Sequence, residues 1–345
     1  ITRFLNQEDY SDIPGVLVRH GSDIISRYPA VPIKEMDSLP VPDFHDYYEQ
    51  LPEALKHPCN RHEMSVPVET SRGCWWGAVH HCVFCGLNPT TMAFREKTPE
   101  RAVSEILGLR DTYGERRITA VDNIISTRYF ESVLPKLEGE GLDLFYETKA
   151  NLNESQVQRL ARAGVRTIQP GIEGLNSNIL RLMDKGVHGH QNLELLKWCS
   201  VYNLQPIWFY LYRFPNEPMN AYFQDIARIP RWFHLPPPRN PNPVVIDRYS
   251  PLYSSRDKFG IHNLRPGGYT DLCYRGLPEA DRMRISYHFE ADLPQGNDLP
   301  YEIGLWEVIT RWNTAYGAGA RLYQFCAPSC TLILDTRREN AAAYL

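Results

Sequence analysis

Three cysteines are the residues of this chain whose type and spacing most clearly indicate chemistry. Two residues separate Cys82 from Cys85, so both thiolates reach one metal centre, and Cys74 joins them if the seven residues between Cys74 and Cys82 bulge outward. Gly73 and Gly77 permit that bend, because glycine adopts backbone conformations closed to other residues. Thiols gathered in one loop of a chain that is otherwise poor in cysteine favour metal binding over cross-linking.

Two kinds of metal centre fit three thiolates without an obvious fourth. A four-iron cluster places one cysteine on each of three irons and leaves the last iron open to an external ligand. A structural zinc site takes its fourth ligand from His80 or His81. Unligated thiols are a third interpretation, and the spacing alone leaves all three open. The position of the loop, after the first strand of a predicted barrel, favours the cluster, because barrels carry reactive groups at that face.

Composition excludes several classes of protein. The 345 residues include 37 basic and 41 acidic side chains, and a formal net charge of −4 argues against a broadly basic nucleic-acid surface. The longest apolar run, near residues 207–212, is far shorter than the roughly 20 residues of a membrane helix, and no signal segment is present. We expect a cytoplasmic protein that binds neither nucleic acid nor membrane. Because the chain begins at Ile1, we also expect a processed or cropped piece of a longer protein.

The elements that must position the cysteine loop follow a βα period. Residues 1–65 are rich in proline and predict a linker or wrapping arm. From Val66 onward, short β-rich runs alternate with helix-period segments, which is typical of a parallel sheet. Predicted strands occupy residues 66–70, 117–121, 144–148, 165–169, 205–212 and 244–247. Predicted helices begin at Thr98 and Asn153, occupy 130–137, 178–185, 191–202 and 301–316, and follow Pro218.

This order predicts an α/β fold, a partial (β/α)6 barrel over residues 66–250. No glycine-rich phosphate fingerprint follows the first strand, which argues against an open doubly wound sheet. A stiff proline-rich connection fills residues 214–251. Residues 251–345 form a C-terminal extension on the substrate side, loop-rich at first and ending in a hairpin that turns through Cys326 to Cys330.

Several sequence runs resemble the radical S-adenosylmethionine (SAM) superfamily. These are the cysteine loop with its Trp-Trp-Gly and Cys-Gly-Leu-Asn surroundings, the run QPGIEGL at 169–175 and the run LMDKG at 182–186. With its wide first gap, the loop is most similar to the cobalamin-dependent branch that matures ribosomally made peptides (RiPP biosynthesis). Residues 37–43 resemble the linker between the cobalamin domain and the barrel of that branch.

The resemblance implies that Cys74, Cys82 and Cys85 hold a [4Fe–4S] cluster whose open iron chelates SAM. His80 and His81 would then lie beside the metal rather than on it. Reductive cleavage of SAM would give a 5′-deoxyadenosyl radical, and cobalamin would carry a methyl group to an unactivated carbon of a precursor peptide with a leader region. A flavodoxin or ferredoxin would supply the electron. Residues 1–65 show no cobalamin-binding pattern, so we expect that domain to have been cropped or the corrin to be held elsewhere.

Two alternatives to peptide methylation remain. One is another radical outcome in a precursor peptide, such as epimerisation, cross-linking or ring closure. The other, from a different class, is a zinc-stabilised peptide-binding module without chemistry.

The remaining candidates follow the ends of the second to fifth strands, where barrel enzymes place their active sites. Helix capping, an exposed ion pair and turn stabilisation are the simpler roles for the three pairs predicted to contact SAM. Packing in the core is the simpler role for the two tyrosines that could line the cavity. The SAM-contact candidates are Asp122, Asn123, Glu147, Lys149, Gln169 and Glu173, and the candidate catalytic residues are Tyr210 and Tyr212.

Overall fold

The computed structural model describes residues 2–26, 28–57, 64–296, 298–337 and 342–344. The chain divides into two compact units, Ile1–Pro40 and Val41–Leu345. The arm predicted as a linker contains short elements in its described part. They are α1 (Thr2–Leu5), the antiparallel hairpin β1 (Val18–His20) and β2 (Asp23–Ile25), and the 3-10 turn η1 (Met36–Ser38) in the first unit, and α2 (His45–Glu49) and α3 (Glu53–Lys56) in the second.

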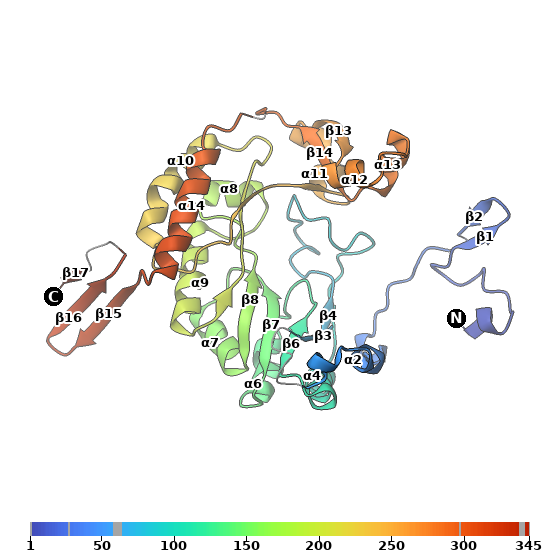
Figure 1. The fold of residues 1–345 in the computed structure, drawn as a ribbon, viewed down its shortest axis with the longest axis horizontal. Helices are drawn as coiled ribbons and strands as arrows, with labels where there is room; N and C mark the ends of the chain where they lie inside the picture. Colours follow the sequence, from blue (N-terminus) through green and yellow to red (C-terminus); the bar gives the residue numbers. More distant parts are fainter. Residues whose placement is uncertain (1, 27, 58–63, 297, 338–341, 345) are drawn as a thin grey trace. The chain divides into compact units, whose positions relative to one another are not determined.

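A parallel half-barrel forms the centre of the second unit (Figure 1). Five parallel strands pair in the order β3 (Val66–Val68), β6 (Arg117–Ala120), β7 (Asp143–Thr148), β8 (Val165–Pro170) and β9 (Gln205–Pro206). A further parallel pair joins β10 (Tyr210–Tyr212) to β11 (Pro241–Pro243). The Leu211 amide donates to Glu173 O at 2.8 Å, so β10 is hydrogen-bonded to the segment that follows β8. The predicted α/β fold class is therefore confirmed.

Helices cover the outer face of the strands, as Figure 1 shows for α7, α9 and α10. Local signals start two of them: Thr98 Oγ1 accepts from the Arg101 amide at 3.3 Å, and Asn153 with Gln156 forms the predicted capping box. Buried apolar side chains of these helices and of the strands form one continuous core. The helices are α4 (Pro99–Tyr113), α5 (Tyr129–Ser132), α6 (Leu134–Leu137), α7 (Glu154–Arg162), α8 (Ser177–Leu182), α9 (Gly189–Val201), α10 (Met219–Arg228), the 3-10 turn η3 (Ile229–Trp232) and α14 (Glu302–Gly317).

Several predicted elements differ in detail from the structure, among them the strand predicted over 205–212, which is two short strands, β9 and β10. The sixth strand was predicted at 244–247, but the pairing with β10 uses residues 241–243, and β12 (Ile246–Asp247) belongs to another sheet. The helix predicted over 130–137 is two short helices, because Pro135 lacks the amide that would continue the first. The helix predicted over 178–185 ends at Leu182, and residues 183–186 form a loop.

The C-terminal region contains a small sheet where the sequence predicted mainly loops. Strands β12, β14 (His288–Asp292) and β13 (His262–Pro266) pair antiparallel in that order, and Ile246, Leu252, Ile261, Phe289 and Ala291 form their own core. The elements between these strands are α11 (Pro251–Ser254), the 3-10 turn η4 (Arg256–Phe259), α12 (Gly268–Cys273) and α13 (Glu279–Ile285). In the described ranges, no helix is both long and apolar enough to cross a bilayer.

The predicted terminal hairpin is present, with a tighter turn than expected. Strand β15 (Leu322–Ala327) pairs with β16 (Cys330–Asp335), which also pairs with β17 (Ala342–Tyr344). Cys326 lies opposite Thr331, and Ala327 lies opposite Cys330. Both cysteines are therefore strand residues rather than turn residues. Because they occupy adjacent cross-strand positions, their side chains point to opposite faces of the hairpin.

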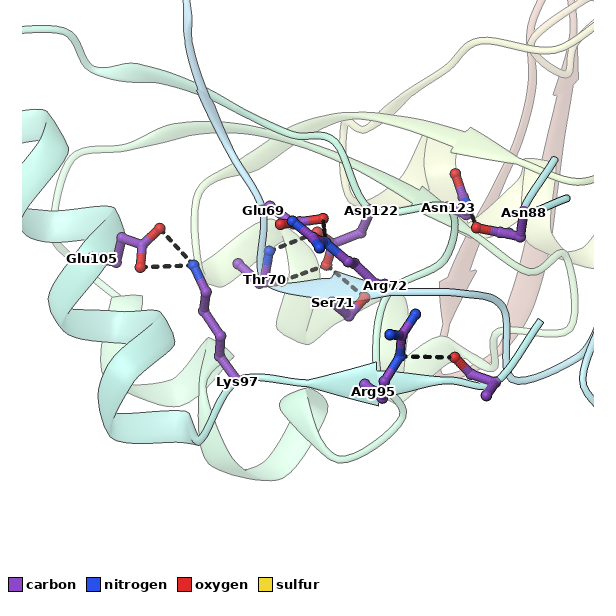
Figure 2. Close-up of polar contacts among 11 residues, drawn as sticks. Glu69, Thr70, Ser71, Arg72, Asn88, Arg95, Lys97, Glu105, Asp122 and Asn123 are labelled. Carbon is purple, nitrogen blue, oxygen red and sulfur yellow. Dashed lines mark hydrogen bonds and ion pairs between the residues drawn. The ribbon is translucent and has the colours of Figure 1, made fainter. Parts of the chain in front are cut away.

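A buried ion pair fixes the return of the cysteine loop to the barrel. The loop leaves after β4 (Ser71–Arg72) and returns through β5 (Arg95–Glu96), a strand that pairs with β4. Lys97 follows β5, and its Nζ lies 2.7 Å from both carboxylate oxygens of Glu105 on α4 (Figure 2). Both side chains are almost completely buried. The Lys97 amide also donates to Thr70 O at 2.9 Å, so the two ends of the loop are held together.

We expect the substitution Glu105→Gln to lower the free energy of unfolding by about 3 kcal/mol, because it leaves the buried Lys97 without its counter-charge. The double substitution Lys97→Met/Glu105→Leu removes both charges and should recover at least half of that loss. Urea unfolding followed by circular dichroism measures both. A single variant as stable as wild type, or a double variant no more stable than the single, would contradict the assigned role of this pair.

Candidate functional site

The cysteine loop brings its three thiols into one neighbourhood. The Cys74 amide donates to Met92 O at 3.2 Å, which joins the start of the loop to its returning segment. The Cys85 amide donates to Cys82 O at 3.0 Å, which closes a turn between these two cysteines. All three thiols are free and half-buried. Burial, together with the smaller effects of the neighbouring Cys82 and Cys74, raises the pKa of Cys85 to about 11. Each thiol is therefore close enough to affect the ionisation of the next.

The donor set fits a cluster better than a single zinc ion. In the part of the chain that the structure describes, no three Cys, His, Asp or Glu side chains meet at the spacing of single-ion ligands. A four-iron cluster does not require that convergence, because each thiolate binds its own iron. The two histidines have other contacts: His81 Nε2 lies 2.8 Å from Cys85 O, and the His80 ring stacks on Trp76 at 4.4 Å. Both histidines thus lie beside the thiols, as a cluster with one open iron requires.

The loop after α8, residues 183–186, supports the cysteine loop from the barrel side. The Val83 amide donates to Met183 O at 3.1 Å, and Trp76 Nε1 donates to Asp184 O at 3.1 Å. The Trp76 ring lies directly on the backbone of Gly186, where an added Cβ would come within 2.1 Å of Trp76 Cη2. Only glycine fits there, and its φ of +61° also belongs to the left-handed region. This contact fixes where the thiols sit.

Two lysines place positive charge beside the thiols. Lys149 Nζ lies 3.6 Å from the centre of the Trp76 ring and donates to Lys185 O. Lys185 Nζ lies 3.3 Å from Glu173 Oε1. Burial lowers the pKa of Lys149 to about 8. Burial also opposes the charge of Lys185, but Glu173 and Cys82 outweigh it and hold the pKa of Lys185 above its ordinary value.

Asp122 and Asn123 follow β6, and Figure 2 shows their contacts. The Asp122 carboxylate is fully buried, and burial raises its pKa to about 6. It accepts from the Thr70 amide at 2.7 Å, from the Thr70 hydroxyl, and from Ser71 Oγ at 2.9 Å. Asn123 Nδ2 donates to Asn88 Oδ1 at 3.0 Å. The Asp122 side chain therefore ties the segment after β3 to the end of β6, and the contact of Asp122 and Asn123 with SAM stays a prediction.

Glu147 and Lys149 follow one another at the end of β7 and make different contacts. The side chain of Glu147 is half-buried, and among the described residues it has no hydrogen bond or ion pair. Burial raises its pKa to about 7, with Glu173 contributing. Glu147 lies opposite Gln169 in the β7–β8 register, and Gln169 is exposed. Strand β7 ends at Thr148, so the alternation of faces stops before Lys149, which contacts Trp76 instead.

The turn after β8 is held in a shape that presents Glu173. Glu173 has a φ of +57°, and the Gly171 amide donates to Thr148 O at 3.0 Å. Asn192 on α9 clamps the turn from outside, since its Nδ2 lies 3.0 Å from Ile172 O and 2.7 Å from Gly174 O. The turn therefore holds Glu173 against Lys185 and near Glu147.

Tyr210 and Tyr212 pack in the core, the simpler of the two roles considered from the sequence. Tyr210 is completely buried, and its hydroxyl donates to Asp225 on α10. The Tyr212 hydroxyl donates to Glu302 Oε1 on α14 at 2.5 Å. Both side chains connect strand β10 to helices that cover the barrel.

Lys185 and Asn192 are site residues that sequence reasoning did not single out. Lys185 lies in the LMDKG run that carried the family resemblance, so a signal for it was present, whereas Asn192 lies inside a helix with nothing local to mark it. Of the remaining cysteines, Cys199 is buried, and Cys273, Cys326 and Cys330 are exposed. Cys59 lies outside the described residues.

We expect Gly186→Ala to destabilise the docking of the cysteine loop, because its new Cβ overlaps Trp76. Gly114→Ala is a matched control, since Gly114 has a similar φ of +67° and no atom within 4 Å of an added Cβ. The control should cost about 1 kcal/mol in unfolding free energy, the price of left-handed backbone alone. Gly186→Ala should cost at least about 2 kcal/mol more and should speed labelling of Cys82 and Cys85 by a thiol reagent in the metal-free protein. Equal effects of the two substitutions would contradict the assigned contact.

Comparison with known protein sequences agrees with this geometry. Residues 68–228 match the model of the Radical SAM superfamily. The chain is 25% identical over 211 residues to an uncharacterized methyltransferase of Pyrococcus horikoshii, covering 59% of this chain and 44% of the relative. It is 28% identical over 198 residues to the bacteriochlorophyllide d C-12(1)-methyltransferase of Chlorobaculum tepidum, covering 54% and 41%. The chain thus spans less than half the length of these curated relatives.

Two solved structures share the fold. The cobalamin-dependent SAM radical enzyme OxsB with aqua-cobalamin superposes with a TM-score of 0.61 at 14% identity, covering 91% of this chain and 48% of that chain. The radical SAM methyltransferase TsrM from Kitasatospora setae, with cobalamin and a [4Fe–4S] cluster bound, gives 0.60 at 14% identity, covering 89% and 65%. The half-barrel and the three thiols after its first strand agree with the match of residues 68–228 to the model of the Radical SAM superfamily, whose members use a [4Fe–4S] cluster and SAM.

Proposed function

We propose that this chain belongs to a radical SAM enzyme that methylates an unactivated carbon of a ribosomally made precursor peptide, with cobalamin as the methyl carrier. The observation that carries the proposal is the group of three coupled free thiols, flanked by two lysines, on the loop after the first barrel strand. The methyltransferase relatives and the cobalamin-bound structures of the same fold support methyl transfer. The sequence surroundings of the cysteine loop support a peptide as substrate.

In this proposal Cys74, Cys82 and Cys85 are the thiolate ligands, and no histidine blocks the remaining iron. When bound, the [4Fe–4S] cluster supplies the electron that cleaves SAM. The protein positions the reactants and excludes water. Trp76 covers the barrel side of the loop, and Trp75 covers another side, with its Nε1 donating to Ile125 O at 3.0 Å.

Charge and hydrogen bonding near the thiols match the parts of SAM. Lys149 and Lys185 offset the negative charge that three thiolates and a SAM carboxylate bring into a partly buried site. Glu147 and Gln169 lie in register at the carboxyl ends of β7 and β8. Their carboxylate and amide suit the ribose hydroxyls, because ionised Glu147 accepts and Gln169 both donates and accepts.

The outer bend of the cysteine loop suits electron delivery. Ala78, Val79 and His80 are exposed, whereas the thiols are half-buried behind them. A flavodoxin or ferredoxin docking at this bend would come close to the cluster.

Anaerobic reconstitution with iron and sulfide tests the proposal. Wild type should become brown, bind about four irons, and release 5′-deoxyadenosine from SAM after reduction. Cys85→Ala should lose most of the iron and the SAM cleavage. Cys273→Ala, which changes an exposed thiol far along the chain from the loop, is the matched control and should behave as wild type. A colourless protein with one zinc, or a Cys85→Ala variant with full iron and cleavage, would overturn the cluster assignment.

The methyl-transfer part is tested on the same preparation. Methylcobalamin, SAM carrying a deuterated methyl group, and candidate precursor peptides are added, and the peptides are analysed by mass spectrometry. The proposal expects a gain of one deuterated methyl group that requires cobalamin. A peptide that is modified without that mass gain would contradict methylation and support another radical reaction. Methylation of a non-peptide substrate alone would contradict the peptide assignment.

A further inference from the structure

A cavity of about 890 Å³ lies between the C-terminal region and the segments that follow β10 and β11. This volume is in the range that holds a ligand the size of a short peptide or a drug. Its lining is mainly apolar and comes from the segments after β10 and β11, the α12 region, and β14 with the residues before it. The α12 and β14 segments lie in the orange part of Figure 1. Leu272, Tyr269 and Ile285 line it while remaining well exposed to solvent, so the cavity is open to a ligand.

The cavity wall is attached to the cysteine loop. Tyr287 lines the cavity, and its hydroxyl donates to the carbonyl of Gly86, the residue after Cys85, at 2.9 Å. Leu252 also lines it, and the Leu252 amide donates to Val83 O at 2.9 Å. A Cβ on Gly86 would come within 2.4 Å of Arg248 O, so the two backbones touch. A ligand in this cavity therefore lies next to the loop that carries the thiols.

Arg265 and His288, two of the basic side chains that line the cavity, have acidic partners. Arg265 Nη1 lies 3.2 Å from Asp292 Oδ1, and Arg265 Nε lies 3.6 Å from Glu290 Oε2. His288 Nδ1 lies 2.7 Å from Asp247 Oδ1. With these counter-charges in place, the lining offers mainly apolar area. An uncharged apolar occupant is favoured over a polycarboxylate macrocycle.

An edge strand beside the cavity favours a peptide as that occupant. Strand β13 is the outer strand of the described sheet β12–β14–β13, and its Arg265 lines the cavity. The residues after it, Gly267 and Gly268, line the cavity without side chains that would cover the backbone. An extended peptide gains main-chain hydrogen bonds at such an edge while its alternate side chains enter an adjoining pocket.

We propose that this cavity binds an uncharged, apolar segment of the substrate peptide and so presents a neighbouring residue to the reactive centre. The inference rests on the proposed peptide substrate and adds its chemical class and its place. The residue to be modified would lie a few positions along the chain from an apolar run, since the cavity wall and the cysteine loop are in direct contact.

Photocrosslinking to the reconstituted full chain tests this. The probe is the blocked peptide Ac-Gly-Ile-Bpa-Leu-Gly-NH2, in which Bpa is the photoreactive p-benzoylphenylalanine. Crosslinks should map to the cavity segments around Leu272 and Tyr287. The apolar competitor Ac-Gly-Ile-Val-Leu-Gly-NH2 should suppress them at a concentration at least about tenfold lower than the polar competitor Ac-Gly-Ser-Asn-Gln-Gly-NH2 or protoporphyrin IX.

Leu272→Asp should reduce crosslinking at least about tenfold, because it places a charge in the apolar lining. Leu277→Asp is the matched control, since Leu277 is an exposed leucine of the same region outside the lining, and it should change crosslinking less than about twofold. Thermal unfolding checks that both variants fold. Crosslinks elsewhere, no crosslinks, equal effects of the two substitutions, or stronger competition by protoporphyrin IX would each overturn the inference. Wild-type SAM cleavage, measured without peptide, separates failure of this inference from failure of the proposed function.

Discussion

The contact between Trp76 and the loop at residues 183–186 is the constraint on which the site depends. Free thiols on a long loop have no defined geometry, and a cluster ligand set needs one. Here the indole ring touches a residue that must be glycine, donates to a backbone carbonyl of the same loop, and has Lys149 Nζ 3.6 Å from its centre. These contacts hold the barrel side of the cysteine loop in place against the end of α8. The opposite side of the loop contacts the C-terminal region through Gly86, whose carbonyl accepts from the Tyr287 hydroxyl.

Charge balance is the second consequence of this arrangement. Buried lysines are costly unless they are paired, and the partners of Lys185 here are Glu173 and the nearby thiols. The same lysines would be unfavourable beside a neutral apolar ligand. Their presence beside three thiols indicates a site built to accept net negative charge, which is what thiolates and the carboxylate of SAM bring. The turn that carries Glu173 is clamped by Asn192, so this balance depends on an α9 residue that itself carries no charge.

The sequence predicted the features that have local causes. The capping box at Asn153 and Gln156, the helix start at Thr98, and the period of strands and helices in the half-barrel all follow from neighbouring residues, and the structure confirms them. The errors lie where distant contacts decide. The helix predicted over 178–185 ends at Leu182, since Asp184 and Gly186 have positive φ and Trp76 packs on Gly186.

Other differences have the same origin. Strand β7 ends at Thr148, and Lys149 contacts Trp76, a residue of the cysteine loop that nothing local to Lys149 indicates. The small C-terminal sheet was missed because its strands are short and β13 is largely polar, although Phe289 and Ala291 alternate with exposed residues in β14. The cavity beside that sheet is invisible in the sequence because its lining comes from segments far apart in the chain.

The central claim is that three thiolates leave one iron free for SAM. Mössbauer spectroscopy tests it most directly, on protein reconstituted with isotopically enriched iron and measured with and without SAM. The account predicts that SAM shifts the signal of a single iron site toward higher coordination and leaves the other sites unchanged. A spectrum in which no single site responds to SAM, or in which every iron already has a protein ligand, would contradict it.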